Sequence, residues 1–139
     1  MQLIEEIQKT LERSLEGTSP FLIELGGLGV FPDKHAPQIL WIGIEGLTNE
    51  LLDLASQVEE SVVPIGFQKD DKSFHPHLTI ARIKKDHRKI GQGLDQTRIL
   101  AAPCSFGRLR VEKVCLFKSE LYPTGPVYTK IWFVTFGTR

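Results

Sequence analysis

The 139-residue sequence lacks most of the features that mark a specialised protein. Its two cysteines, Cys104 and Cys115, are too far apart for a CxxC redox or zinc pair, so we expect free thiols without a chemical role. No apolar run is long enough to cross a bilayer, and the first residues contain glutamates where a secretory signal needs a basic and an apolar region. We therefore expect a cytoplasmic protein that does not contact membranes.

The sequence also lacks an excess of charge of either sign. The 17 basic and 17 acidic residues cancel, which excludes a protein that coats nucleic acid through bulk charge, since such domains are strongly basic. Any contact with nucleic acid must then be local. The length is that of one domain, residues 1–139, which can bury enough apolar surface to fold without disulfides or metals.

The spacing of apolar residues predicts helices and strands in mixed order. Leu3, Ile7 and Leu11 recur at helical spacing in an amphipathic helix over residues 2–16, and Thr48 is a suitable N-cap for a second helix over 48–63. The absence of strict βαβ alternation indicates an α+β fold with antiparallel sheets. The other predicted elements are a hairpin of strands 21–25 and 38–44 with a bulged, glycine-rich connection, a short strand near 65–68, a strand at 77–83, a weaker helix at 90–101, and strands at 109–117 and 127–136 joined by a turn at 119–126.

The run FHPHLTIAR contains two of the four histidines. Successive side chains of a strand point to opposite faces, so we expect His75, His77 and Thr79 to share a polar face, and Leu78 and Ile80 to face the core. A histidine exchanges protons near neutral pH, which suits general acid or base catalysis. A threonine hydroxyl two residues along the same face can hold a phosphate oxygen beside the imidazole.

Three interpretations of this run are open from the residues alone. The simplest is a solvated strand face with incidental histidines, because HxT occurs by chance in many sequences. A second is a metal site, since His75 and His77 present two imidazoles to one ion, although Pro76 lies between them and no acidic third ligand is evident. The third is phosphoester chemistry. There, Arg82 would reach the phosphate only if the strand twists or ends before it, because its odd spacing from His77 turns it to the other face.

The wider sequence resembles a known family. PHLTIAR, preceded by GFQKDDKSF, is similar to the second HxTx motif of the 2H phosphoesterases, in the RNA 2',3'-cyclic phosphodiesterase branch, whose members are also called 2'-5' RNA ligases. The resemblance covers nearly the whole chain, because four other runs occur in the order found in that branch. They are ELGGLGVFP and LWIGI before the motif, and VCLFKSEL and GPVYTKIWFVTF after it. It implies a bilobal α+β fold of antiparallel sheets with flanking helices, here without its N-terminal strands.

The resemblance also implies a function. Members carry two HxTx motifs that face each other across a cleft, where a cyclic phosphate or a 2'-5' linkage at an RNA end is cleaved without a metal or other cofactor. His77 and Thr79 match the second motif, as general acid or base and as phosphate ligand. Arg82 matches a basic residue that follows the motif and would be an auxiliary phosphate ligand. His75 receives no role.

The first HxTx motif is absent from this sequence. The resemblance places it before the helix predicted over residues 2–16, and no other histidine is followed by Thr or Ser at the required spacing. In-line hydrolysis needs one group to take a proton and another to give one on opposite sides of the phosphorus, so His77 alone should give weak activity. Three explanations stay open: a shortened copy of an ordinary enzyme, a homodimer that pairs two copies of His77 through an exposed sheet edge, and a non-catalytic binder of RNA ends or phosphate.

Two other features have alternative interpretations. The basic run 83–89 is either a solvated loop or a rim that attracts RNA phosphates. Trp41 and Phe74 are either core residues or platforms on which nucleobases stack. The glycines of GGLG do not have the spacing of a nucleotide-binding GxGxxG loop.

Overall fold

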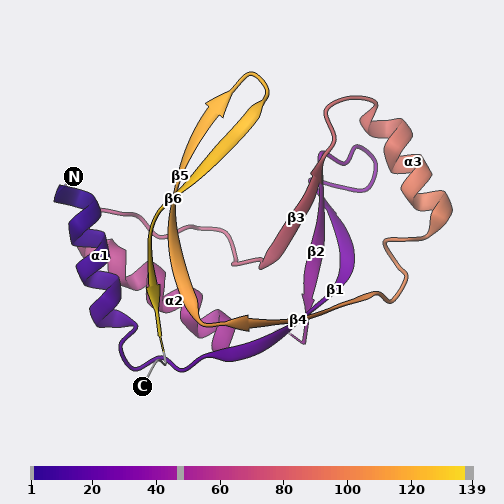
Figure 1. Cartoon of the computed structure of the whole chain (residues 1–139). Helices are drawn as coiled ribbons and strands as arrows, with labels where there is room; N and C mark the ends of the chain where they lie inside the picture. The colour runs from indigo at the N-terminus through magenta and orange to yellow at the C-terminus, as the bar shows by residue number, and fades with distance from the viewer. Residues whose placement is uncertain (1, 47–48, 137–139) are drawn as a thin grey trace. The chain divides into compact units, whose positions relative to one another are not determined.

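The computed structural model describes residues 2–46 and 49–136 and has an α+β fold with antiparallel strand pairs, as the sequence predicts (Figure 1). Four strands form one sheet in the order β3-β2-β1-β4, and β5 pairs with β6 in a second sheet. No helix in the described residues is long and apolar enough to cross a membrane. The elements are α1 (Gln2–Ser14), β1 (Phe21–Phe31), β2 (Ile39–Glu45), α2 (Asn49–Val62), the 3-10 turn η1 (Val63–Ile65), β3 (His77–Arg82), α3 (His87–Thr97), β4 (Ser105–Val111), β5 (Lys113–Tyr122) and β6 (Gly125–Thr135).

The described residues divide into two compact units. The first unit comprises residues 2–21, 49–73 and 110–136, and the second comprises residues 22–46 and 74–109. The first unit therefore contains α1, α2 and the β5–β6 hairpin, whereas the second contains β2, β3 and α3 together with most of β1 and β4.

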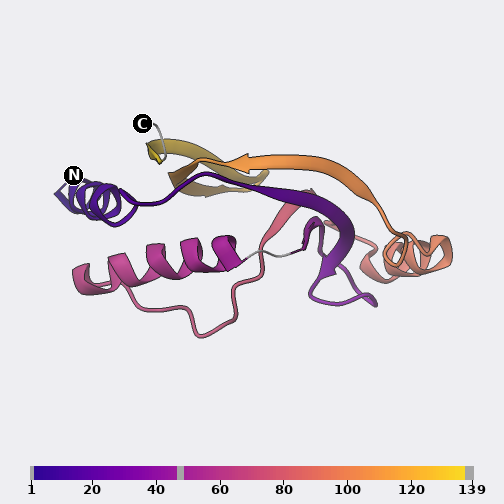
Figure 2. The same ribbon diagram turned by 90° about the horizontal axis from the view of Figure 1, so that it is seen from below.

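The core of the first unit lies where α1 and α2 pack against the β5–β6 hairpin. Ile7 and Leu11 of α1, and Leu15 directly after its end, recur every four residues and are 7%, 3% and 1% exposed. They cluster with Leu54 of α2 and with Phe136, and Figures 1 and 2 show the two helices side by side. The hairpin packs one of its faces against this cluster through Val114, Leu116, Trp132 and Val134.

Both amphipathic helices form where the sequence predicts them. The first ends at Ser14 rather than at residue 16. The second runs from Asn49 to Val62 and has Glu50 in its first turn, where a carboxylate is favourable. The predicted N-cap Thr48 lies outside the described residues.

Two predictions for the segments after α2 are wrong. In the described part of the chain no strand forms near residues 65–68, because Pro64 directs the backbone into η1. α3 covers His87–Thr97 instead of 90–101. Its first turn is polar and gave no apolar signal, and Arg98 ends the helix with a left-handed φ of 55°.

The predicted strand 109–117 is in fact two strands. β4 ends at Val111 and β5 begins at Lys113, and the two belong to different sheets. The apolar alternation changes phase at this point, since Val114 is an odd number of positions from Val111. One continuous strand cannot keep both residues on the same face, so the chain changes sheets at Glu112.

The turn predicted over residues 119–126 is much shorter. β5 continues to Tyr122, which pairs directly with Gly125, so Pro123 and Thr124 alone form the connection. Gly125 has a φ of 127°, which residues with a side chain rarely adopt. The hairpin is therefore longer than the sequence indicated, as the long strand pair in Figure 1 shows.

The β1–β2 hairpin contains the predicted bulge at a different place. β1 does not end at residue 25 but continues through the glycines to Phe31. The register with β2 shifts between Gly26 and Leu28, and Gly27 has a φ of 72°. The bulge thus lies within the strand rather than in the connection.

Candidate active site

His77 and Thr79 lie at exposed positions on one face of β3, as predicted. His77 pairs with Gly43 of β2, and Thr79 pairs with Trp41. Side chains of directly paired residues point to the same side of a sheet. The imidazole, the hydroxyl and the Trp41 indole therefore share one face, which we call the HxT face.

The opposite face of β3 is not buried, which corrects the prediction. Leu78 is 48% exposed and Ile80 is 50% exposed. Ile80 is also the extra residue of a β-bulge, because the register with β2 shifts by one residue between Thr79 and Ala81.

The bulge changes the face on which Arg82 lies. Simple alternation would put Arg82 opposite His77. In the structure Arg82 pairs with Ile39, which is two residues from Trp41 on β2 and therefore on the same side of the sheet. The register thus assigns Arg82 to the HxT face, so the undistorted strand assumed from the sequence is wrong at this point.

A backbone carbonyl orients the His77 ring. Nδ1 of His77 lies 2.7 Å from the carbonyl oxygen of His75. Because a carbonyl only accepts hydrogen bonds, Nδ1 carries the proton in this contact. The neutral ring then has its lone pair on Nε2, which is the nitrogen free to accept a proton from water or a hydroxyl.

Aromatic rings flank both imidazoles. The centroids of the Phe31 and His77 rings are 5.1 Å apart, with the ring planes at 89°. The centroid of the Trp41 ring lies 4.9 Å from that of His75 and 5.2 Å from that of Phe31, and the two imidazole centroids are 6.0 Å apart. No local pattern pointed to Phe31, which is remote from His77 along the chain. The signal was indirect, because only the full register of the β1–β2 hairpin brings Phe31 to the HxT face.

Glycines make room for the Trp41 indole. Gly29 pairs with Trp41, and a Cβ at Gly29 would overlap the indole ring. A Cβ at Gly43 would come within 3.3 Å of the same ring. The indole therefore lies across the backbone of β1. Its Nε1 is buried and has no hydrogen-bond partner among the described residues.

A cavity of about 340 Å³ lies beside these rings. Its walls include Trp41, Phe74, His75 and Pro76, together with the glycine-rich backbone of β1. Phe74 is 50% exposed, so it is a surface residue rather than a core one. The volume is within the range of small-molecule sites. His75, which had no role from the sequence, therefore lines a cavity next to His77.

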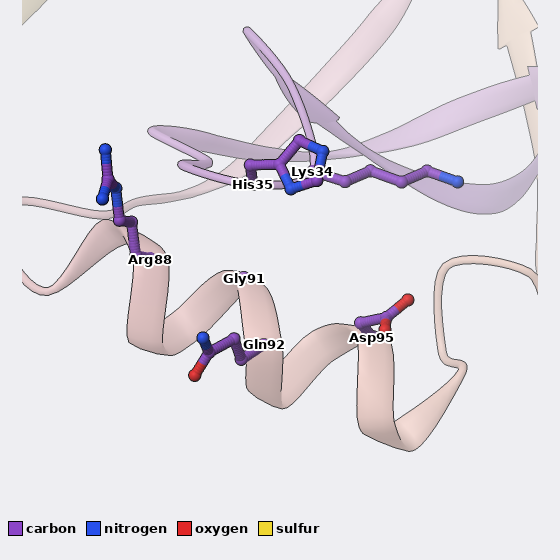
Figure 3. A pocket seen from close by; sticks show the side chains of 6 residues that line it. All are labelled: Lys34, His35, Arg88, Gly91, Gln92 and Asp95. Carbon is purple, nitrogen blue, oxygen red and sulfur yellow. The ribbon is translucent and has the colours of Figure 1, made fainter.

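A second cavity, of about 530 Å³, lies between α3 and the β1–β2 loop (Figure 3). Gly91 allows the helix and the loop to touch, since a Cβ there would be 2.5 Å from the carbonyl oxygen of Lys34 and 2.8 Å from that of His35. The side chains of Lys34 and Arg88 point to opposite ends of this cavity (Figure 3). Its positive charges therefore do not converge on one ligand.

The basic run 83–89 is only partly the loop that was predicted. His87 begins α3, and its Nε2 lies 2.8 Å from the carbonyl oxygen of Ile83. In the ranges 2–46 and 49–136, no group of three or more His, Cys, Asp or Glu side chains is placed to hold a metal ion.

This fold and this strand motif define a family. The sequence pattern of the 2'-5' RNA ligase superfamily matches residues 2–122, so the chain belongs to this superfamily and the resemblance seen in the sequence is confirmed. The chain is 36% identical over 132 residues to the RNA 2',3'-cyclic phosphodiesterase of Aquifex aeolicus, covering 91% of this chain and 66% of that protein. It is also 36% identical over 125 residues to the RNA 2',3'-cyclic phosphodiesterase of Archaeoglobus fulgidus, covering 89% and 68%. The chain therefore spans about two thirds of the length of these relatives.

Solved structures show the same fold. A crystal structure of a Thermus thermophilus protein aligns with a TM-score of 0.74 at 26% identity, covering 98% of this chain and 71% of that chain. E. coli LigT complexed with 3'-AMP aligns with a TM-score of 0.70 at 17% identity, covering 99% and 70%. At this identity the likeness to LigT supports the fold alone.

Proposed function

We propose that this chain belongs to a cytoplasmic enzyme that acts on RNA ends bearing a 2',3'-cyclic phosphate or a 2'-5' linkage, with His77 as a metal-independent general acid or base. The Thr79 hydroxyl would donate a hydrogen bond to a non-bridging phosphate oxygen, and the Arg82 guanidinium would bind a second one. One observation carries the proposal. The strand register assigns all three side chains to the exposed HxT face.

The tautomer of His77 leaves Nε2 as the nitrogen that exchanges a proton with the substrate. With the Nδ1 proton engaged by the His75 carbonyl, Nε2 accepts a proton from an attacking water, or donates one to the departing ribose oxygen once the ring is charged. In-line displacement needs a second such group on the far side of the phosphorus. His75 is a poor candidate, because its ring adjoins that of His77 at 6.0 Å. A segment outside this sequence or a second copy of the chain would supply the group.

A binding role without turnover is the second candidate. It is favoured by the single HxT in this sequence, since Thr79 and Arg82 would still hold a terminal phosphate without a complete acid–base pair. Losing one of the two proton-transfer groups typically lowers the rate by on the order of 10² to 10⁴.

Hydrolysis of a nucleoside 2',3'-cyclic phosphate by the purified chain, with a chelator present, tests both candidates. The enzyme proposal predicts slow turnover that His77→Ala reduces by roughly 10²-fold or more. His35→Ala is the matched control, because His35 lies in the β1–β2 loop, outside the HxT face. Binding without turnover that is weakened by Thr79→Val supports the second candidate. If the chain neither binds nor hydrolyses the cyclic phosphate, both candidates are wrong.

A further inference from the structure

One face of the β5–β6 hairpin, in the first unit, carries exposed aromatic and basic side chains. The pairs Cys115–Phe133, Phe117–Lys130 and Ser119–Tyr128 lie at alternating positions along the hairpin, so all six side chains point to the same side. Lys113, which pairs with Thr135, belongs to this side as well. We call Lys113, Phe117, Tyr128, Lys130 and Phe133 the aromatic–basic face.

The opposite face of the hairpin packs against the core and has paired charges. There Val114, Leu116 and Trp132 pack against the core cluster of α1 and α2. Its charges also cancel, because Lys118 forms an ion pair with Glu120 at 3.2 Å. The alternation of the strands thus puts the apolar residues and the compensated charges on the core side. The aromatic–basic face is left with two lysines and no acidic residue among the paired positions of the hairpin.

The rings of the aromatic–basic face are accessible. Phe117 is 51% exposed, Tyr128 is 58% exposed and Phe133 is 51% exposed. Exposing three large aromatic side chains on one sheet face costs solvation free energy that a core position would avoid. Such a patch commonly marks an interaction surface.

Phe133 organises the positive charges on this face. The ammonium of Lys113 lies 5.5 Å from the centroid of the Phe133 ring, and that of Lys130 lies 5.7 Å from it. Both are within cation–π distance, so one ring holds two ammonium groups close together. Phe117 and Tyr128 then remain as rings whose faces no described cation covers.

We propose that the aromatic–basic face binds single-stranded RNA, with bases stacked on Phe117 and Tyr128 and backbone phosphates bound by Lys113 and Lys130. Aromatic rings interleaved with lysines on a sheet are the combination that binds single strands without sequence readout. The absence of acidic residues from the paired positions of this face favours a polyanion over a protein partner or a second copy. The inference rests on the proposed function only for the choice of RNA as the ligand, and it assigns this chain an oligonucleotide substrate rather than a mononucleotide.

The experiment measures binding of a fluorescently labelled single-stranded RNA of roughly 8 nucleotides, a length within the site sizes of stacking surfaces. It is done in the His77→Ala background, so that binding is read without turnover. Phe117→Ala and Tyr128→Ala should each weaken binding roughly 5- to 100-fold, the range found when one stacked base is lost. Tyr128→Phe should retain the affinity, because it keeps the ring.

The lysines are tested through the salt dependence. Lys113→Gln and Lys130→Gln should each lower the slope of log affinity against log salt by about 0.7, the value for one phosphate contact to a single strand. Tyr122→Ala and Lys118→Gln are the matched controls, since both residues lie on the opposite face, and they should bind RNA like the parent.

The outcomes separate this inference from the proposed function. Native affinity in the Phe117→Ala/Tyr128→Ala double variant would overturn it, even if His77 proves catalytic. Conversion of a dimer to a monomer by that double variant, measured by light scattering, would also overturn it and identify the face as an interface between copies. Loss of RNA binding with a native circular dichroism spectrum would support it, even if the chain shows no turnover.

Discussion

The Phe31 ring meets the His77 imidazole edge-on, with centroids 5.1 Å apart and planes at 89°. Phe31 ends β1 and pairs with Ile39, so the register of the β1–β2 hairpin puts it on the HxT face. The carbonyl of His75 also restrains the ring, through its contact with Nδ1. The direction of Nε2 therefore depends on β1 as well as on the HxT segment itself.

Phe31→Ala should displace the His77 ring. Under the proposed function it should then lower kcat for a nucleoside 2',3'-cyclic phosphate by on the order of 10²-fold, with a smaller change in KM, since misplacing a catalytic group has effects of this size. Phe31→Tyr keeps the ring and should restore most of the rate. The imidazole proton resonances of His77, followed by NMR, report the ring position directly. Phe106→Ala, at an exposed position on β4, is the control, and unshifted His77 resonances in Phe31→Ala would show that Phe31 does not orient the ring.

Gly29→Ala tests the packing of Trp41 over β1. The new methyl group would overlap the indole, so the ring must move and the free energy of unfolding should fall by about 1–3 kcal/mol. The tryptophan fluorescence of the folded protein should change with it. Urea unfolding followed by far-UV circular dichroism measures the free energy of unfolding, and an emission spectrum reports the change in tryptophan fluorescence. An unchanged spectrum together with native stability would contradict the described position of Trp41.

Features that depend on near neighbours in the sequence were predictable. The helix over residues 2–16 follows from apolar residues four apart, and the shared face of His77 and Thr79 follows from strand alternation. The position of Arg82 was not predictable, because the bulge at Ile80 has no glycine or proline to mark it. Bulges of this kind are set by pairing with a neighbouring strand rather than by local propensity.

Long-range pairing also explains the remaining errors. Leu78 alternates as a core residue does, yet whether a strand face is buried depends on what packs against it, which the strand's own sequence does not encode. The contact of Phe31 with His77 requires three strands in register. The change of sheet at Glu112 was missed because the residues before it and after it both have the pattern of a strand. The only local sign is that the alternation of apolar residues shifts by one position there.

Gly91 and Gly93 form a matched pair on α3. Gly91→Ala should lower the free energy of unfolding by about 1–3 kcal/mol, because its Cβ would be 2.5 Å from the carbonyl oxygen of Lys34 and the loop must move (Figure 3). Gly93→Ala has no atom within 4 Å of the new Cβ and should raise stability by about 0.5–1 kcal/mol through helix propensity. Denaturant unfolding of the two variants checks the pair. Equal effects would show that the helix does not pack on the loop at Gly91.

Asp33 gives a pH dependence to the same loop. Its carboxylate accepts hydrogen bonds from the backbone N–H of Ala36 at 3.0 Å and of His35 at 2.9 Å. These bonds, that from Ala36 above all, lower the pKa of Asp33 below its ordinary value of 3.8. A lowered pKa in the folded state stabilises the fold above the ordinary value, and this stabilisation is lost as the pH falls through the lowered value.

Asp33→Ala should therefore melt at a lower temperature than the native chain at neutral pH. The difference should shrink as the pH falls from the ordinary value of 3.8 through the lowered pKa, below which the carboxylate is protonated in the folded state as well as in the unfolded state. Thermal unfolding followed by circular dichroism across the acid range provides the measurement, with Asp71→Ala at an exposed position as the control. A difference that does not vary with pH would mean that the ionised carboxylate is not what holds the loop.

Arg82→Gln tests whether the bulge at Ile80 brings the guanidinium to the HxT face. A charge-assisted hydrogen bond to phosphate contributes about 1.5–3 kcal/mol, so the affinity for a nucleoside 3'-monophosphate should fall by roughly 10- to 100-fold. Arg82→Lys keeps the charge but loses the bidentate geometry, so its affinity should lie between those of the native chain and Arg82→Gln. Titration calorimetry at fixed salt measures the three affinities, with Arg88→Gln on α3 as the control for loss of one positive charge. If Arg82→Gln binds as the native chain does while Thr79→Val does not, then Arg82 faces away from the phosphate and the register argument fails.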